Sequence, residues 1–406
     1  MIRMKKTLKI ILIVAIVVIL GLLGWFWLFP GSSEPVADKV RDFLPFGTGE
    51  GVNIPPGDEQ STIDNGQGSQ SGPEVKLFQV SKEPVAGFIA FSKGATTTIR
   101  YADRATGHIY DMNPLTQEKT KVTNKTLPKI YEAYFRDNGN SVLFRSLVND
   151  SDMVENLSLA LTPPKIISTT TDNLYTVLAV NLRGDIKEVA VGSGDSLFYV
   201  AEDSSSIISS TFNGTNLRTL FNSSFTDWRL VPYGNNLMIY TRVSSDIPGY
   251  AYRLNSNGAL TKILGPLNGL TVTPNSSGGF AYSYNNEGSL KLVAKEDSAS
   301  EEVDLPPTFA EKCVWSSEKE WIIYCAIPTQ NINGKDIDNW YKGISHFSDK
   351  VWYFDTRVNI SEVLVESDKN LGFDLDAIHL EISPNEDYLV FMNKNDLSLW
   401  ALKLER

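Results

Sequence analysis

The residues that could do chemistry gather in one stretch near the C-terminal end of the chain. Between residues 328 and 349, aromatic side chains alternate with acids and amides, and the segment interrupts a run of short apolar stretches. Clustered tryptophan and tyrosine are typical anchors of protein contacts, and a sugar contact would use them as well. Our candidate binding residues are Asp336, Asp338, Trp340, Tyr341, His346 and Phe347. A second interpretation leaves Trp340 and Phe347 as anchors that hold this insert against the rest of the fold.

The two cysteines, Cys313 and Cys325, flank the first hairpin of the same region. A simple hairpin centred on residues 317–318 would place Trp321 or Ile322 opposite Cys313. A disulfide would therefore require a bulge or a longer turn. Three interpretations stay open at this stage: a disulfide, two buried free thiols, and a reactive thiol. A metal site is excluded, because two cysteines without nearby histidines supply too few ligands.

The remaining polar clusters do not form a recognisable catalytic motif. Pairs of acids occur at Asp150 and Asp152, at Asp336 and Asp338, and at Asp374 and Asp376. They lack the EF-hand spacing, so we expect solvated loops and no calcium site. The three histidines, His108, His346 and His379, are scattered. With no P-loop, nucleophile elbow or zinc-protease motif, we expect neither an enzyme nor a bound cofactor or metal.

The elements that position the candidate residues are predicted to be β-strands. The chain consists of short apolar stretches separated by turn residues and has no long run of helical periodicity. Similar units recur every roughly 35 to 55 residues, which is the spacing of β-propeller blades. We therefore predict an all-β propeller over residues 75–406, with seven blades; six and eight stay open. The last unit lacks its fourth strand. We expect residues 75–80 to supply that strand and to close the ring, which removes open sheet edges.

The last unit also carries a family resemblance. The turn Ser383, Pro384, Asn385 is followed by the apolar residues 388–391 and then by residues 397–400, Leu-Ser-Leu-Trp. This order resembles the TolB-like propeller repeat of bacterial envelope proteins, which is similar in turn to WD repeats. In the other units the turn departs from the pattern. The resemblance implies a propeller that acts more often as a scaffold for protein contacts than as an enzyme.

The N-terminal 74 residues predict a membrane anchor and a linker. Residues 10–29, which begin at Ile10 and end at Phe29, are uncharged and apolar over the length that crosses a bilayer. Four basic residues precede them, so residues 1–9 are expected in the cytoplasm. No small-x-small cleavage site follows, which favours an uncleaved signal anchor over a cleaved signal peptide. Residues 30–74, rich in Gly, Pro and Ser, are expected to be a flexible linker.

Charge and topology together limit the partners. The formal net charge is −11, and an acidic chain repels phosphate backbones, so we expect no nucleic-acid partner. We expect a single-pass protein of the cell membrane whose extracytoplasmic propeller binds another envelope protein, in envelope assembly or secretion. The alternative is a propeller that binds or cleaves carbohydrate or peptidoglycan. Paired carboxylates along the central channel would favour that alternative.

Overall fold

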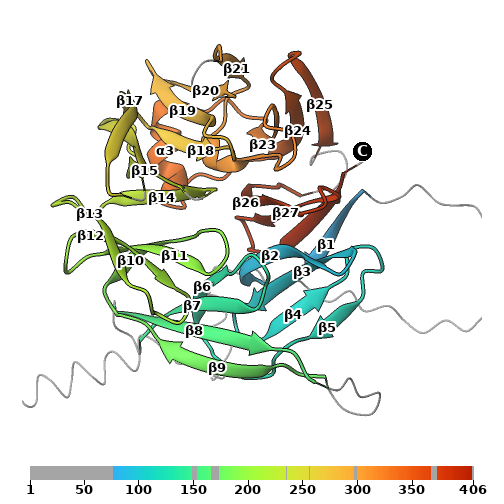
Figure 1. Ribbon diagram of the computed structural model, residues 1–406. Helices are drawn as coiled ribbons and strands as arrows, with labels where there is room; N and C mark the ends of the chain where they lie inside the picture. The colour runs from blue at the N-terminus through green and yellow to red at the C-terminus, as the bar shows by residue number, and fades with distance from the viewer. Residues whose placement is uncertain are drawn as a thin grey trace, which may run out of the picture. The chain divides into compact units, whose positions relative to one another are not determined.

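The seven-bladed β-propeller predicted from the sequence is confirmed. The computed structural model describes residues 76–148, 153–165, 173–234, 236–255, 257–296, 300–366 and 373–404. In these residues the strands form seven four-stranded sheets, which follow one another around a ring in Figure 1. The expected cytoplasmic tail (1–9), membrane anchor (10–29) and linker (30–74) lie outside the described residues.

Blades 1 to 4 each place their strands in chain order from the channel outward. Blade 1 comprises β2 (Val85–Lys93), β3 (Thr96–Asp103), β4 (Ile109–Met112) and β5 (Lys119–Lys121). Blade 2 comprises β6 (Ile130–Phe135), β7 (Ser141–Leu147), β8 (Val154–Thr162) and β9 (Thr176–Asn181). Blade 3 comprises β10 (Ile186–Val191), β11 (Ser196–Ala201), β12 (Ser206–Thr211) and β13 (Arg218–Asn222). Blade 4 comprises β14 (Trp228–Tyr233), β15 (Asn236–Thr241), β16 (Pro248–Leu254) and β17 (Leu260–Asn268).

Blades 5 to 7 repeat this order, and the last blade combines both ends of the domain. Blade 5 comprises β18 (Thr271–Pro274), β19 (Phe280–Asn286), β20 (Ser289–Lys295) and β21 (Val303–Leu305). Blade 6 comprises β22 (Cys313–Trp315), β23 (Ile322–Pro328), β24 (Asp349–Asp355) and β25 (Ile360–Glu366). Blade 7 comprises β26 (Ala377–Ile382), β27 (Tyr388–Asn393), β28 (Leu399–Lys403) and, as its outer strand, β1 (Leu77–Ser81).

Strand β1 closes the ring as the sequence predicts. It pairs antiparallel with β28, with Leu77 opposite Leu402 and Phe78 opposite Ala401. The outer edge of β28 is thereby covered by the N-terminal end of the domain. Closure of this kind removes an edge that would otherwise be available for pairing with other chains.

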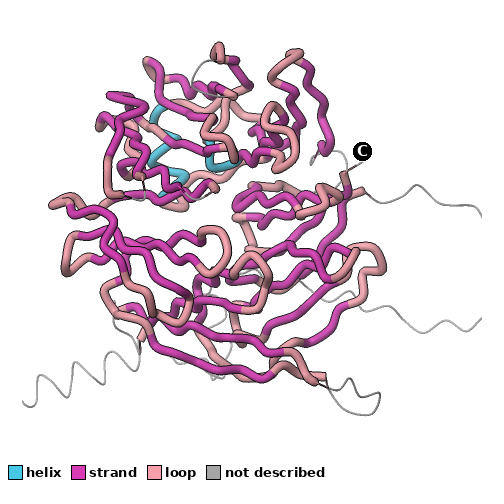
Figure 2. Tube along the Cα trace, viewed as in Figure 1, coloured by secondary structure: helices cyan, strands magenta, loops and turns pink. Residues whose placement is uncertain are grey.

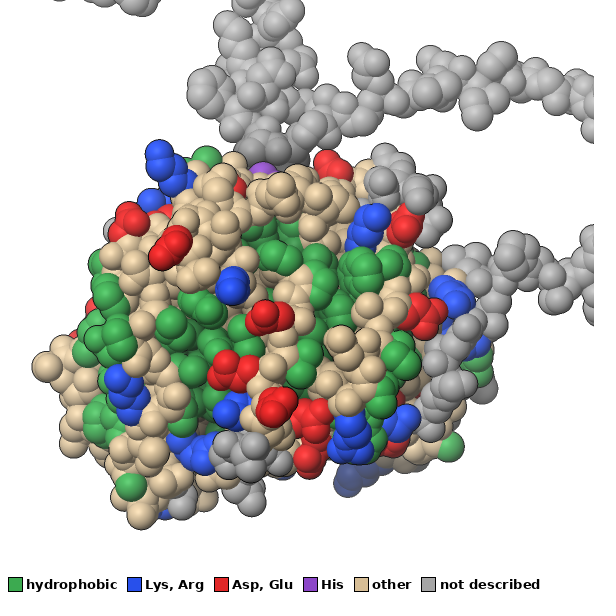
Figure 3. Space-filling view, turned by 90° about the horizontal axis from the view of Figure 1, so that it is seen from above, with side chains coloured by type: hydrophobic (Ala, Val, Ile, Leu, Met, Phe, Trp, Pro, Cys, Tyr) green, Lys and Arg blue, Asp and Glu red, His purple; other side chains and the backbone are tan. Residues whose placement is uncertain are grey.

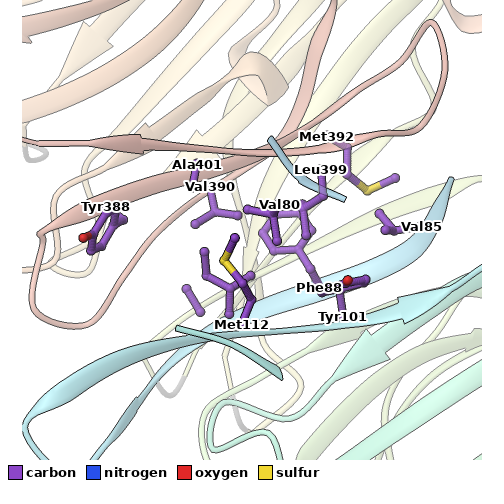
Figure 4. Packing of buried hydrophobic residues seen from close by; sticks show 12 residues of the cluster. Val80, Val85, Phe88, Tyr101, Met112, Tyr388, Val390, Met392, Leu399 and Ala401 are labelled. Atoms are coloured by element: carbon purple, nitrogen blue, oxygen red, sulfur yellow. The ribbon is translucent and has the colours of Figure 1, made fainter. Parts of the chain in front are cut away.

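The hydrophobic core lies between neighbouring blades, and β27 shows why. Every residue of β27 is buried, and alternate side chains point to opposite faces of a strand. Val390 and Met392 pack with Phe88 and Tyr101 of blade 1, as Figure 4 shows. Phe391, between them in the sequence, packs instead against blade 6. A central strand of a blade is therefore apolar on both faces.

The strand β9 and the helix α3 (Gly334–Tyr341) were not predicted from the sequence. Strand β9 is exposed over most of its length, so its residues lack the alternation that indicates a half-buried strand. The insert between β23 and β24 contains the helix α3, shown in cyan in Figure 2. The side chain of Asn333 accepts from the backbone of α3, and Asp336 accepts from the Asn333 N–H, which is a capping box.

The short 3-10 helix η1 (Ala310–Lys312) precedes β22. Neither η1 nor α3 has the length and apolar character of a membrane span, and the same holds for the whole described part of the chain.

Candidate functional site

A cavity of about 2010 Å³ opens at the end of the channel where the innermost strands of blades 2 to 4 begin. Its wall includes Glu132 of β6, Glu188 of β10 and Arg229 of β14. On the side of blade 6 the wall is formed by Glu311 of η1 and Tyr341 of α3. We call this space the mouth cavity. One charged residue near the start of each innermost strand of blades 2 to 4 lines it.

The charges of the mouth cavity are organised as ion pairs. Arg145 donates from Nη1 to Glu132 Oε2 at 2.7 Å, and Arg229 donates from Nη1 to Glu188 Oε2 at 2.7 Å. Arg145 also donates to the backbone oxygen of Ile186 at 2.9 Å, which ties blade 2 to blade 3. The guanidinium groups are therefore held in place before any ligand arrives.

Glu311 completes the polar wall through two tyrosines. It accepts from the hydroxyl of Tyr341 at 2.9 Å and from the hydroxyl of Tyr240. Burial, together with the nearby Glu311 carboxylate, raises the pKa of both tyrosines well above the usual value, so both remain donors at neutral pH. Burial raises the pKa of Glu188 to about 7, against the opposing effect of Arg229. Glu188 therefore changes its charge near neutral pH.

The insert is anchored to the fold by aromatic packing. Trp340 and Phe347 are 6% and 5% exposed. The Trp340 ring stacks on Phe309, with ring centroids 4.8 Å apart, and Ile337 is fully buried beside them. Trp340 also borders the mouth cavity. The anchoring interpretation therefore describes Trp340 and Phe347, and α3 belongs to the core of the propeller.

A buried ion group fixes the base of the insert. Lys312 donates to Asp349 Oδ2 at 2.7 Å and to Asp376 Oδ1 at 2.6 Å, and none of the three side chains is exposed. Asp376 also accepts from Trp340 Nε1 at 3.0 Å. Burial raises the pKa of Asp349 to about 6, opposed by Lys312. The expectation of a solvated loop is wrong for Asp376, because that carboxylate is the counter-ion of a buried lysine.

The other candidate residues of the insert lie away from the cavity wall. Asp336 caps α3, and Asp338 accepts from the backbone N–H of Ser245 at 3.2 Å and from its hydroxyl. His346 is exposed. Of the six candidates, the structure brings only Trp340 and Tyr341 into the mouth cavity.

The cysteines form a disulfide between β22 and β23. Cys313 lies directly opposite Cys325, with their Cα atoms 4.1 Å apart. The simple hairpin register is wrong: strand pairing stops at Trp315 opposite Ile323, and a longer turn connects them. A longer turn is one of the two features, a bulge or a longer turn, that a disulfide was expected to require.

No group of three or more potential metal ligands occurs among the residues that the structure describes. The acidic pair Asp150 and Asp152 lies outside them. Asp374 is exposed, whereas Asp376 belongs to the buried ion group.

Sequence reasoning missed the residues that make the mouth cavity. Glu132 and Glu188 are each the third residue of an innermost strand, and Arg229 is the second residue of the next one. A charge at an equivalent place in consecutive units was the available signal, because innermost strands are otherwise largely apolar. Glu311 offered no such signal, since it precedes its strand.

The comparisons with known proteins show the fold alone. No protein-family model matches this chain, and no curated protein matches its sequence. It is similar to the oligogalacturonate lyase from Vibrio parahaemolyticus, with 10% identity, 83% of this chain and 95% of that chain covered, and a TM-score of 0.52. Virginiamycin B lyase from Staphylococcus aureus is 12% identical over 81% of this chain and 99% of its own, with a TM-score of 0.48. The β-propeller domain of the Trilobed protease from Pyrococcus furiosus is 8% identical over 79% and 96%, with a TM-score of 0.49.

The surface in Figure 3 carries acidic and basic side chains interspersed with hydrophobic ones. On that face, the visible described side chains form no continuous basic patch of the kind that follows a phosphate backbone.

Proposed function

We propose that this chain is a non-enzymatic binding module that receives a segment of another protein in the mouth cavity. The observation that carries this proposal is the size and wall of the cavity: about 2010 Å³, with a wall that includes residues of blades 2, 3, 4 and 7, η1 and α3. Small-molecule sites usually occupy about 300 to 1,000 Å³. A cavity of twice that volume suits a loop or an extended peptide.

The chemistry of the wall supports the same proposal. Tyrosine and arginine are enriched among the residues that dominate protein interfaces, and the wall presents Tyr341 and Arg229 in fixed positions. The carboxylates of Glu132 and Glu188 already accept from arginines. Because these groups are held by one another, binding would require little ordering of the free protein.

We also propose that the propeller works outside the cytoplasm, attached to the cell membrane by residues 10–29. The disulfide between Cys313 and Cys325 supports this location, because disulfides persist in oxidising compartments. The TolB-like pattern of the last blade supports a role in the cell envelope, and an envelope protein is the partner we propose.

A photo-crosslinking residue at Ile344 tests the binding surface in intact membranes. Ile344 is 67% exposed on the insert, and Val358, 58% exposed on a turn between outer strands, is the matched control. We expect one protein to crosslink at position 344 and not at 358, and to be lost when Tyr341→Ala is added. Equal crosslinking at both positions, or a crosslink that survives Tyr341→Ala, would contradict the proposal. Deletion of the insert is unsuitable, since α3 is part of the core.

Reporter fusions at the C-terminus test the topology. We expect alkaline phosphatase to be active and a cytoplasmic fluorescent reporter to be dark. The opposite pair of results would place the propeller in the cytoplasm and refute the anchored arrangement.

One observation favours a second candidate, a propeller that binds or cleaves glycans. Glu188, whose pKa burial raises to about 7, shares the mouth cavity with a second carboxylate, Glu311, and glycoside hydrolysis uses a pair of carboxylates. The test is incubation of the full chain with peptidoglycan fragments. Turnover that is lost in both Glu188→Gln and Glu311→Gln would replace the first proposal; we expect no turnover.

A further inference from the structure

A second, smaller cavity lies at the other end of the channel, where the innermost strands end. Its volume is about 560 Å³, within the usual range of small-molecule sites. Most of its wall is apolar, with Phe88 of β2, Phe135 of β6, Val191 of β10 and Met392 of β27. We call it the inner cavity. It does not contribute to the function proposed above.

The inner cavity meets the mouth cavity at a backbone irregularity in β26. Glu132, Tyr134 and His379 line both spaces. His379 has a φ of +53°, which a non-glycine residue rarely adopts, and it lies in a bulge where pairing with β27 shifts between Ile378 and Glu381. Such bulges often re-aim side chains next to binding sites, and a non-glycine residue adopts this conformation only at a cost in free energy. His379 and Glu381 both line the inner cavity beside this bulge.

Glu381 is the polar group that the bulge presents to the inner cavity. Its Oε1 accepts from the backbone N–H of Ala90 at 2.8 Å. Among the described residues, Oε2 has no hydrogen-bond partner. Burial raises the pKa of Glu381 to about 8, opposed by the Ala90 N–H. At neutral pH the group is mainly a carboxylic acid, with one O–H to donate.

We propose that the inner cavity binds a small, uncharged, largely apolar molecule whose carbonyl or hydroxyl oxygen accepts a hydrogen bond from Glu381. The apolar part of the wall contributes burial of the ligand, and the O–H of Glu381 fixes its orientation. A carboxylate ligand lacks a cation to pair with here, because the described side chains that line the inner cavity include no lysine or arginine. This proposal is independent of the protein partner at the mouth cavity.

The other titratable groups of the inner cavity are Glu132, Tyr134, Asp137, Tyr233 and His379. Burial raises the pKa of Tyr134 and Tyr233 and lowers that of His379. These three groups therefore stay uncharged between neutral pH and the pKa of Glu381. A change in binding over that interval reports on a carboxyl group.

The test uses the full chain in detergent and three fluorinated probes that differ only in the head group: 4-fluorobenzamide, 4-fluorobenzylamine and 4-fluorobenzoate. Binding is followed by fluorine NMR at about pH 6.5 and about pH 9.5, on either side of the Glu381 pKa. We expect the amide to bind at the lower pH and to lose at least tenfold in affinity at the higher pH. We expect the amine and the benzoate to bind more weakly than the amide at the lower pH.

Two substitutions separate the hydrogen bond from the general shape of the cavity. Glu381→Gln keeps a donor, so the amide should still bind and its pH dependence should disappear. Glu381→Leu removes the donor, so binding should fall at least tenfold. Glu362→Gln, exposed on β25, is the control and should change neither result. Thermal melts followed by circular dichroism show whether each variant is folded.

Three results would overturn the proposal. One is preferential binding of the amine, which would indicate an ionised Glu381 and a cationic ligand. Another is unchanged binding of the amide by a folded Glu381→Leu variant. The third is no binding of the amide at millimolar concentration, which would make the inner cavity a structural space.

Discussion

Lys312 illustrates what a single residue does in this protein. A lysine with no exposed side-chain surface requires compensation, and Asp349 and Asp376 provide it from two different blades. Asp376 extends the group to Trp340 of α3. One buried charge therefore joins blade 6, blade 7 and the insert.

We predict that Lys312→Met lowers the free energy of unfolding by about 3 to 5 kcal/mol, because it leaves two buried carboxylates without a counter-ion. Urea unfolding followed by tryptophan fluorescence measures the change. Lys291→Met, at an exposed position of β20, is the control and should remain within about 0.5 kcal/mol of the parent. A loss below about 1 kcal/mol for Lys312→Met would show that the ion group contributes little.

Glu188 gives a prediction of pH dependence. Its pKa is about 7 in the folded protein, above the value of about 4.3 in an unfolded chain. The folded protein therefore favours the protonated form of Glu188. The stability that this form contributes is fully present below about pH 4.3 and is lost as the pH rises through 7.

Glu188→Gln cannot ionise and so avoids this loss of stability. Between pH 4 and pH 8 the free energy of unfolding of the variant should therefore rise relative to that of the parent. The gain should be roughly 2 kcal/mol, less than the full shift because water reaches the cavity. Urea midpoints across that range measure it, with the exposed Glu362→Gln as control. Parallel pH profiles of variant and parent would show that Glu188 titrates normally.

At the scale of elements, α3 has one side in the core, and its last residue, Tyr341, lies at the mouth cavity. Ile337, Trp340 and the adjoining Phe347 are buried, whereas Tyr341 borders the mouth cavity and Ile344 is exposed. The insert thus forms one wall of the cavity because its other side is fixed in the core.

We expect Trp340→Ala to destabilise the fold by about 3 to 5 kcal/mol, through the lost ring and the void left behind. Ile344→Ala should change stability by no more than about 0.5 kcal/mol. Denaturant unfolding of the two variants decides between an anchored and a loosely attached insert. Similar small effects for both would mean that α3 is not part of the core.

The hairpin β22–β23 carries the disulfide, and its removal is a separate test. Cys313→Ala combined with Cys325→Ala should lower stability by about 3 kcal/mol, the value for closing a short loop. Reduction of the parent with dithiothreitol should produce the same loss. If the unreduced protein reacts with iodoacetamide at both positions, the cysteines are free thiols and this expectation fails.

At the scale of the whole molecule, ring closure decides stability. Strand β1 joins the two ends of the domain through its pairing with β28, and Val80 packs in the core between blades 7 and 1. If β1 detaches, the apolar edge of β28 becomes available to other chains.

Val80→Asp should therefore destabilise the domain by about 3 kcal/mol or more and promote aggregation, because it places a charge in an apolar core. Lys82→Asp, an exposed neighbour, is the matched control and should remain monomeric. Light scattering and urea unfolding measure both effects. A soluble, fully stable Val80→Asp variant would show that the ring does not depend on β1.

The sequence by itself determined the architecture. Alternation of apolar strands and polar turns is a local pattern, and its repeat predicts blades and the closing strand β1, with a count of seven that left six and eight open. Strand β9 was not predicted, because an outer strand with both faces exposed does not need alternating apolar and polar residues. The helix α3 was not predicted because it is short, although its capping residues Asn333 and Asp336 can be read in the sequence.

Only the tertiary structure decided the sites. Glu132, Glu188, Arg229 and Glu311 are separated by tens of residues and belong to different blades, and they share a cavity only because the ring closes. The register of β22 and β23 paired the cysteines through a turn longer than the simplest one. Glu381 lines the inner cavity next to a bulge in β26. Such features depend on contacts between distant segments, which local sequence patterns do not contain.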